Sequence, residues 1–328
     1  MRNLRTAALL ALVVALILAA CAPSATPSGS PSMPTPGGGA TGARTGCLDA
    51  WPAPGMTTST GQLPSLANNQ YLAVGEARLI LALADSAGFP VGDPTWKISA
   101  SLYDLGADGC TPFADGLSMP FAWSIEKVRG FFIGSALIPP ATRELGLLIM
   151  GSDATGAAVR ISFAAPVLGT PIELRPGDKA PTIATPIAAD DPHGVAGVST
   201  DPTPLNRLYS SSAADLLAAK RPFMIVFASP AFCTSQACGP TLKIVKEAAA
   251  LHPKVEIIHV EPYVMAWDGQ RPLPVMQGGR LSPNPIAGAW RIPVEPWVYT
   301  VGSDGVIIRS YDGVVTLAEL DAALAELE

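Results

Sequence analysis

The sequence has few charges and few histidines, and it contains no run of lysine or arginine. Charged residues make up 15% of the 328 residues, the net charge is −6, and there are three histidines. Because nucleic-acid binding depends on a basic patch, that class of function has little support. Aromatic residues are scarce at 6%, whereas proline (33) and glycine (31) are abundant. The length predicts about two domains, and the composition predicts many turns and loops around ordinary cores.

The first 21 residues have the pattern of an export signal. Arg2 and Arg5 precede the apolar run TAALLALVVALILAA, which is too short to be a comfortable transmembrane helix. Residues 18–21 (LAAC) resemble a bacterial lipobox. We therefore predict a lipoprotein signal peptide over 1–21, lipidation of Cys21, and an extracytoplasmic protein anchored to the bacterial cell membrane, at the outer leaflet or the periplasmic face. An ordinary signal peptide or membrane anchor with a chance cysteine is the alternative.

Residues 22–46 are a low-complexity stretch of proline, serine, threonine and glycine. Such a segment buries too little apolar surface to offset the loss of chain entropy, so it is predicted to be a disordered tether. Its estimated reach is roughly 25–30 Å.

Four cysteines remain once Cys21 is assigned to lipidation: Cys47, Cys110, Cys233 and Cys238. An exported compartment permits disulfides. Three pairings are possible, and separation along the chain favours 47–110 and 233–238. The first of these is expected to be structural, with two unpaired thiols as the alternative.

Residues 47–172 have the patterns of an all-β domain. In WKISASLYDL (96–105), apolar side chains alternate with polar ones, which is typical of a half-buried strand. Further apolar runs, such as 71–85, are separated by turn signals. Several short strands at this spacing predict an antiparallel sandwich of the immunoglobulin-like type.

Residues 173–328 alternate between strand and helix patterns. A buried strand is expected at 222–229, a helix at 240–252, a second strand at 254–263, a hairpin at 296–313 and a closing helix at 316–327. Thr316, with Glu319 three residues later, forms a capping-box pattern at the start of the last helix.

This order resembles the thioredoxin fold over roughly residues 174–328. GDKAPTIATP (177–186) is similar to the entry strand of the TlpA-like and peroxiredoxin branches. VEPWVYTVGSDGVI looks like the segment that carries the cis-proline, which maps to Pro296. The predicted fold class is therefore an α/β thioredoxin-like domain (C-terminal) preceded by an all-β immunoglobulin-like sandwich.

In that family the proline faces the cysteines and receives the substrate backbone. The resemblance thus implies a membrane-anchored thiol-disulfide oxidoreductase that acts through Cys233 and Cys238, facing cis-Pro296. Its partners would be protein thiols or disulfides outside the cytoplasm, with no cofactor and no metal.

The spacing of the two cysteines restricts the local structure. On a regular helix, Cα atoms five residues apart are separated by roughly 8–9 Å, beyond the usual disulfide limit of about 7 Å. Residues 233–237 therefore cannot all be helical if the pair is bonded. Pro240 is tolerated only in a first helical turn, so the helix is expected to begin near Cys238.

Cys238 would then lie at a helix N-terminus, where free N–H groups favour a thiolate. Cys238-Gly239-Pro240 also resembles the start of the thioredoxin CGPC signature, with Thr241 where the second cysteine would be. Cys238 is accordingly predicted to attack, with Cys233 as its partner, and the opposite order stays open. Glu295 is a candidate proton acceptor facing the pair, or else a loop carboxylate in water. Glu261 is a weaker candidate.

Three other functions remain open. A Sco-like copper chaperone would use thiolates for Cu(I), but no histidine follows His259, which is predicted to be a packed core residue. A thiol peroxidase would need the peroxiredoxin spacing, which Thr234 and Cys238 miss by one residue, and an arginine such as Arg280 or Arg291. The last is a non-catalytic binding lipoprotein with a structural disulfide.

Overall fold

The computed structural model describes residues 47, 50–52, 56–68 and 72–328. The predicted signal peptide, lipidated Cys21 and tether 22–46 lie outside these residues. The described residues belong to one compact unit, Thr45–Glu328. No helix in this part of the chain is both long and apolar enough to cross a membrane.

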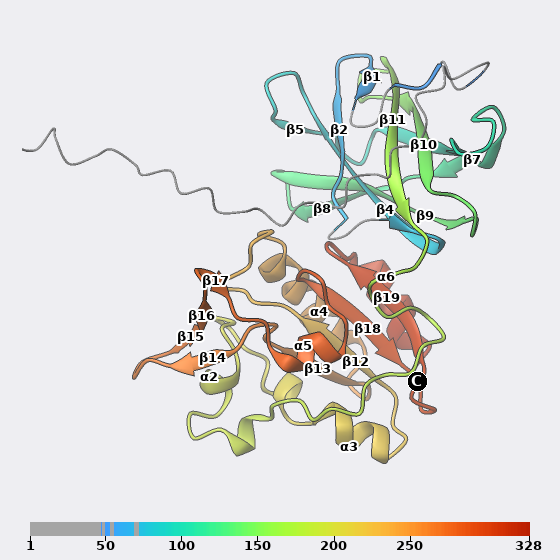
Figure 1. Cartoon of the computed structure of the whole chain (residues 1–328). Coiled ribbons are helices and arrows are strands. Elements are labelled where there is room, and N and C mark those ends of the chain that lie inside the picture. The colour runs from blue at the N-terminus through green and yellow to red at the C-terminus, as the bar shows by residue number, and fades with distance from the viewer. Residues whose placement is uncertain (1–46, 48–49, 53–55, 69–71) are drawn as a thin grey trace, which may run out of the picture. The chain divides into compact units, whose positions relative to one another are not determined.

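Residues 57–168 form two β-sheets (Figure 1). The strands of the first sheet, in order, are β1 (Thr57–Ser59), β11 (Ala158–Leu168), β10 (Glu144–Ser152), β6 (Lys97–Asp104) and β7 (Pro112–Ser118), and β3 (Leu72–Ala73) pairs with β11. Those of the second sheet are β2 (Leu63–Leu66), β4 (Gly75–Ala84), β9 (Arg129–Ile138) and β8 (Phe121–Ile125), and β5 (Pro90–Val91) pairs with β4. All pairings are antiparallel except β3 with β11.

Apolar alternation explains how the two sheets pack. In β6, Ile98, Ala100 and Leu102 are buried, as the sequence predicts. They share one hydrophobic cluster with side chains of the other sheet, including Leu79 of β4. Ser101 is also buried, and its hydroxyl lies 2.5 Å from Asp115 Oδ1, so the polar group is paired. Each fully buried aliphatic side chain contributes about 1.5–3 kcal/mol.

The C-terminal region contains a four-stranded sheet in the order β13 (Glu256–Val260), β12 (Phe223–Phe227), β18 (Trp297–Val301) and β19 (Ile307–Asp312). β12 and β13 are parallel, whereas the other two pairings are antiparallel. Its longer helices are α4 (Cys238–Leu251) and α6 (Leu317–Ala325); the short ones are α2 (Val195–Val198), α3 (Ala213–Ala218) and α5 (Pro285–Ala289). Two small hairpins follow β13: β14 (Met265–Trp267) with β15 (Pro272–Pro274), and β16 (Met276–Gln277) with β17 (Arg280–Leu281).

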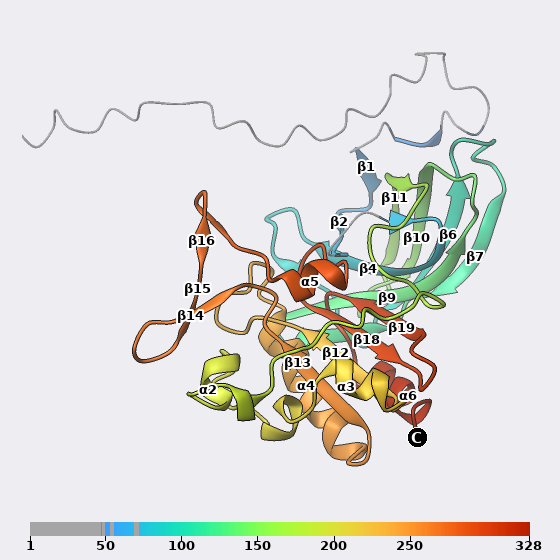
Figure 2. The same cartoon turned by 60° about the horizontal axis from the view of Figure 1, so that its bottom comes forward.

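Alternate side chains of β12 belong to two hydrophobic clusters, which contain residues of different helices. Figure 2 shows the sheet together with these helices. Met224 and Val226 of β12 join a cluster with α4 and α6. Phe223, Ile225 and Phe227 join a second cluster with α3 and α5. The strand is buried on both faces, as its continuous apolar run predicts.

The predicted α/β thioredoxin-like fold class is wrong for this chain. Strands hold 39% of the structure against 17% in helices, and the pairing is predominantly antiparallel. Among the described residues, the only parallel strands joined through a long helix are β12 and β13, through α4. The prediction followed the order of patterns in one region. It did not account for the many strands in the rest of the chain. It also did not account for residues 264–292, which fold as short hairpins and one short helix.

The closing helix begins as the sequence predicts. The Thr316 side chain accepts a hydrogen bond from the Glu319 N–H, and the Glu319 carboxylate accepts one from the Thr316 N–H, which completes the capping box. The same carboxylate also accepts from Arg78 Nε of β4, at 2.8 Å. One glutamate thus caps α6 and binds a strand that lies 241 residues earlier in the chain.

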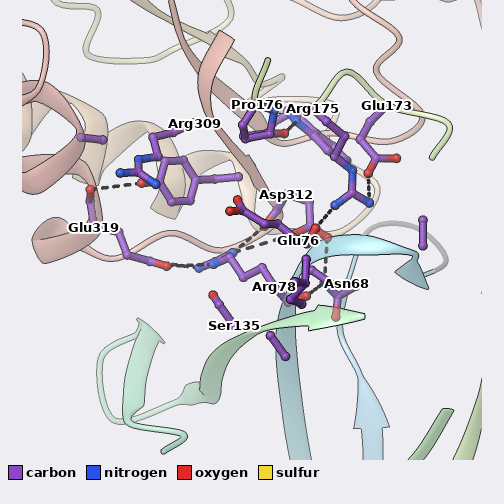
Figure 3. Close-up of a pocket in the computed structure, with 18 of the residues that line it drawn as sticks. Asn68, Glu76, Arg78, Ser135, Glu173, Arg175, Pro176, Arg309, Asp312 and Glu319 are labelled. Atoms are coloured by element: carbon purple, nitrogen blue, oxygen red, sulfur yellow. Dashed lines mark hydrogen bonds and ion pairs between the residues drawn. The ribbon is translucent and has the colours of Figure 1, made fainter. Parts of the chain in front are cut away.

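Arg78 lines a cavity of about 770 Å³ between β4, β19 and α6 (Figure 3). Besides Glu319, its guanidinium donates to the carbonyl of Asp312 at 2.9 Å and to that of Val314 at 2.5 Å. The side chain is only 8% exposed. This arginine therefore fastens β4 to the segment that connects β19 with α6.

Replacing Arg78 with methionine should destabilise the protein by roughly 3 kcal/mol. This is the lower end of the range for breaking a buried ion pair, because Glu319 is 25% exposed. Chemical denaturation of the purified variant would measure the change. Lys127→Met is the matched control, since the Lys127–Glu126 pair is exposed on both sides and its loss should leave stability unchanged. Equal stability of the two variants would contradict the role given to Arg78.

His252 links the end of α4 to α6. Its Nε2 lies 2.9 Å from Asp321 Oδ1 and its Nδ1 lies 3.1 Å from Glu328 Oε1. Burial by itself lowers the pKa of His252, but the hydrogen bonds and negative charges of the two carboxylates outweigh it, so the pKa is raised.

This histidine should make stability depend on pH. A raised folded-state pKa means that its contribution is fully present below the unfolded value of about 6.5 and is lost as the pH rises through the folded value. The difference in melting temperature between the wild type and His252→Asn should therefore be largest near pH 6 and shrink toward pH 9. Asp321→Asn should weaken that pH dependence. A difference that is constant with pH would refute the assignment.

Candidate functional site

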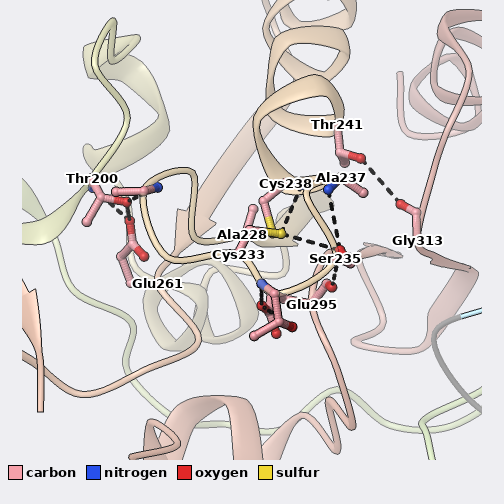
Figure 4. The surroundings of a disulfide bond; sticks show 12 residues. Thr200, Ala228, Cys233, Ser235, Ala237, Cys238, Thr241, Glu261, Glu295 and Gly313 are labelled. Carbon is pink, nitrogen blue, oxygen red and sulfur yellow. Dashed lines mark hydrogen bonds between the residues drawn. A yellow bond between two sulfur atoms is a disulfide. The ribbon is translucent and has the colours of Figure 1, made fainter. Parts of the chain in front are cut away.

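The two cysteines lie where β12 leads into α4 (Figure 4). Cys233 and Cys238 form a disulfide with a Cα–Cα distance of 5.9 Å. The helix begins at Cys238 and Pro240 lies in its first turn, as the sequence predicts. Cys233 lies in the preceding loop, which turns through Gln236 with φ at 61°.

The two sulfur atoms have different environments. Cys238 is fully buried and belongs to the hydrophobic cluster of β12, α4 and α6, whereas Cys233 is half-buried. The Cys238 N–H, at the start of the helix, points to Cys233 Sγ at 3.2 Å, and the Ser235 hydroxyl lies 3.3 Å from the same sulfur. Helix N-terminal N–H groups stabilise a thiolate. Sequence reasoning preferred Cys238 as the attacking thiolate, but burial and these contacts favour Cys233.

Glu295 faces the pair from the start of β18. It is only 3% exposed, and its peptide bond to Pro296 is cis. Its Oε1 accepts hydrogen bonds from the Thr234 N–H at 3.1 Å and the Thr234 hydroxyl at 3.3 Å. One carboxylate oxygen of Glu295 and the two cysteine sulfurs all lie within 4.8 Å of one another. The side chain is therefore part of the disulfide site and not a loop carboxylate in water.

Tyr263 is a member of this site that the sequence did not reveal. Its hydroxyl lies close to Glu295 and Thr234. Burial and the neighbouring Glu295 carboxylate raise the pKa of Tyr263, so the hydroxyl stays protonated beside that carboxylate. Its position at the end of the strand predicted over 254–263 gave no indication of this contact.

Glu261 and His259 have structural roles on the neighbouring strand. Glu261 Oε1 accepts from the Thr200 N–H and hydroxyl, each at 2.7 Å, and this carboxylate is not part of the cysteine cluster. His259 is 2% exposed and lies 2.9 Å from both Tyr209 Oη and the Ala228 carbonyl. Because a carbonyl only accepts, Nε2 donates to it, and Nδ1 accepts from the tyrosine.

Burial lowers the pKa of His259, so the ring is neutral. The prediction of a packed core histidine is confirmed. Through Ala228 it fixes the point where β12 ends and the cysteine loop begins. The arginines considered for a peroxidase are occupied or exposed: Arg291 donates to the Pro171 carbonyl, and Arg280 is an exposed residue of β17.

A groove of about 370 Å³ adjoins the loop before Cys233. Its lining includes Thr200, Ala231, Phe232 and Trp267 of β14. The Trp267 ring is stacked on His193, with ring centroids 3.8 Å apart. The groove offers apolar surface within a residue of the more exposed cysteine.

The second disulfide joins Cys47 to Cys110, with Cα atoms 5.1 Å apart. It links the start of the described chain to the loop before β7. Nearby, Trp51 Nε1 donates to the Gly109 carbonyl at 3.0 Å. Both pairs that chain separation favoured are therefore present.

No protein-family model matches this chain, and no curated protein matches it significantly. The function is therefore inferred from the residues of the site.

The unequal burial of the two sulfurs predicts unequal reactivity. After mild reduction, Cys233 should react with iodoacetamide at least about tenfold faster than Cys238, because only the thiolate reacts and only Cys233 is both accessible and next to a helix N–H. Peptide mass spectrometry after timed quenching would give both rates in one sample. Faster labelling of Cys238 would restore the assignment made from the sequence.

Proposed function

We propose that this protein is an extracytoplasmic thiol-disulfide oxidoreductase anchored to the bacterial membrane. The observation that carries the proposal is the asymmetric pair: a half-buried Cys233 that receives a helix N–H, bonded to a fully buried Cys238. A buried carboxylate next to both sulfurs adds support. A bond that served only to hold the loop would not need an accessible, polarised sulfur.

The chemistry requires a protein dithiol or disulfide as partner. In the reduced protein, the Cys233 thiolate attacks a partner disulfide, forms a mixed disulfide and releases one partner thiolate. Cys238 then gives its proton to Glu295, attacks Cys233 Sγ and releases the second partner thiolate. Two electrons pass to the partner and the 233–238 bond re-forms. The reverse sequence oxidises a partner dithiol.

Glu295, Pro296 and the groove next to Phe232 assist the exchange reaction. Glu295 is the proton acceptor, held in place by Thr234 and lying next to Tyr263. Pro296 follows it directly with a cis bond, and the Glu295 carbonyl lies 3.2 Å from Ser235 Oγ of the cysteine loop. This position supports Pro296 as a place where the partner's backbone docks beside Cys233. The groove next to Phe232 would receive the partner's neighbouring side chains.

Location and anchoring rest on separate observations. Two disulfides are typical of an oxidising, extracytoplasmic compartment. The lipobox-like sequence that ends at Cys21 supports lipid attachment, with residues 22–46 as the tether. Labelling with a palmitate analogue, lost in Cys21→Ser, would test the anchor.

Trapping with single-cysteine variants tests the exchange reaction. Cys238→Ser leaves the attacking thiol without its resolving partner, so it should accumulate mixed disulfides with extracytoplasmic proteins. These would be visible on non-reducing gels and lost on reduction. Cys233→Ser is the matched control and should trap far less, because Cys238 is buried. If neither variant traps a protein, and the native bond resists excess dithiothreitol, the bond is structural and the proposal fails.

A further inference from the structure

The disulfide site contains three groups whose atoms could ligate a metal ion once the pair is reduced. We propose that reduced Cys233 and Cys238, together with the Glu295 carboxylate, bind one Zn²⁺ ion. This rests on the proposed function only in that the 233–238 bond opens. The oxidised protein would not bind, because a disulfide leaves the carboxylate as the only one of the three ligands.

The spacing of the ligand atoms suits a tetrahedral ion. With Zn–S of about 2.3 Å and Zn–O of about 2.0 Å, tetrahedral geometry places the ligand atoms about 3.5–3.8 Å apart. All three atoms already lie within 4.8 Å of one another. Opening the S–S bond moves the sulfurs apart toward that spacing, and Glu295 has to approach by only a short distance. Three protein ligands leave a fourth position open on the side of half-buried Cys233.

The surroundings hold the carboxylate ready for a cation. Glu295 is 3% exposed, and the polar groups next to it, Thr234 and Tyr263, are uncharged. A carboxylate beside two thiolates in a buried site concentrates negative charge, which a divalent cation would compensate. Hydrogen bonds from neighbouring groups to a ligating carboxylate are the usual means of orienting it.

Zinc binding depends on the redox state of the cysteine pair. A partner dithiol supplies two electrons and two protons to open the disulfide. Zn²⁺ then displaces the two thiol protons and is held by two thiolates and one carboxylate. Oxidation of the thiolates by a partner disulfide re-forms the bond and releases the ion. The same site would therefore alternate between electron exchange and metal binding.

The ligand set favours zinc over monovalent copper. Cu(I) prefers soft sulfur ligands, whereas Zn²⁺ accepts thiolate and carboxylate together. Loss of the Glu295 carboxylate should accordingly lower the affinity for zinc and change the affinity for Cu(I) much less. This difference separates the proposed site from a dithiol that binds any soft metal.

Zinc competition against a chromophoric chelator tests the site. The full chain, in detergent, is refolded with excess phosphine so that all thiols are free even if the native bond resists exchange. Cys233→Ser/Cys238→Ser keeps Cys21, Cys47 and Cys110 and measures the background. The wild type should bind about one more Zn²⁺ than this variant, and Glu295→Gln should weaken that site by at least about tenfold. Glu261→Gln, another buried glutamate outside the cluster, should bind zinc like the wild type.

Two results would overturn the proposal. Equal zinc binding by the wild type and the double-serine variant means that there is no site at the pair. Unchanged zinc affinity in Glu295→Gln, or a loss of Cu(I) affinity in that variant as large as the loss of Zn²⁺ affinity, means that the carboxylate is not a zinc ligand. Neither outcome depends on the trapping experiment, so zinc binding and thiol exchange can fail separately.

Discussion

The start of α4 at Cys238 is the constraint on which the site depends. Pro240 is compatible only with the first turn of a helix, so the chain before Cys238 has to be loop. The loop brings Cys233 back to the N-terminus of α4, where the Cys238 N–H points to its sulfur. This placement puts Cys238 in the first turn of α4 and leaves Cys233 in the loop before it. The burial of Cys238 and the approach of Glu295 come from packing with distant parts of the chain.

Local features of the site could be predicted from the sequence because they depend on neighbouring residues. The helix start, the loop position of Cys233 and the capping box at Thr316 each rest on residue types a few positions apart. The period-two pattern of β6 gave its buried face correctly, apart from Ser101, which is paired with an acid from β7. Chain separation alone identified both disulfide pairs.

Features that depend on distant residues could not be predicted in this way. The α/β class was wrong because an order of patterns in one region says little about how much of the whole chain is strand. The sequence did not indicate that Cys238 is completely buried in a cluster with residues of α4 and α6, and the assignment of the attacking cysteine stays a prediction. Tyr263 and Arg78 meet their partners only through the fold, and no local pattern announces either contact.

The complete burial of Cys238 also has a kinetic meaning. Its sulfur is already beside Cys233, so in the proposed exchange the resolving attack is intramolecular and proceeds at a high effective concentration. Partner concentration would then set only how often a mixed disulfide forms, not how long it lasts. The lifetime of the mixed disulfide would be governed by how fast the Cys238 thiol, which water barely reaches, loses its proton. The groups around that proton would therefore set the rate of the second step.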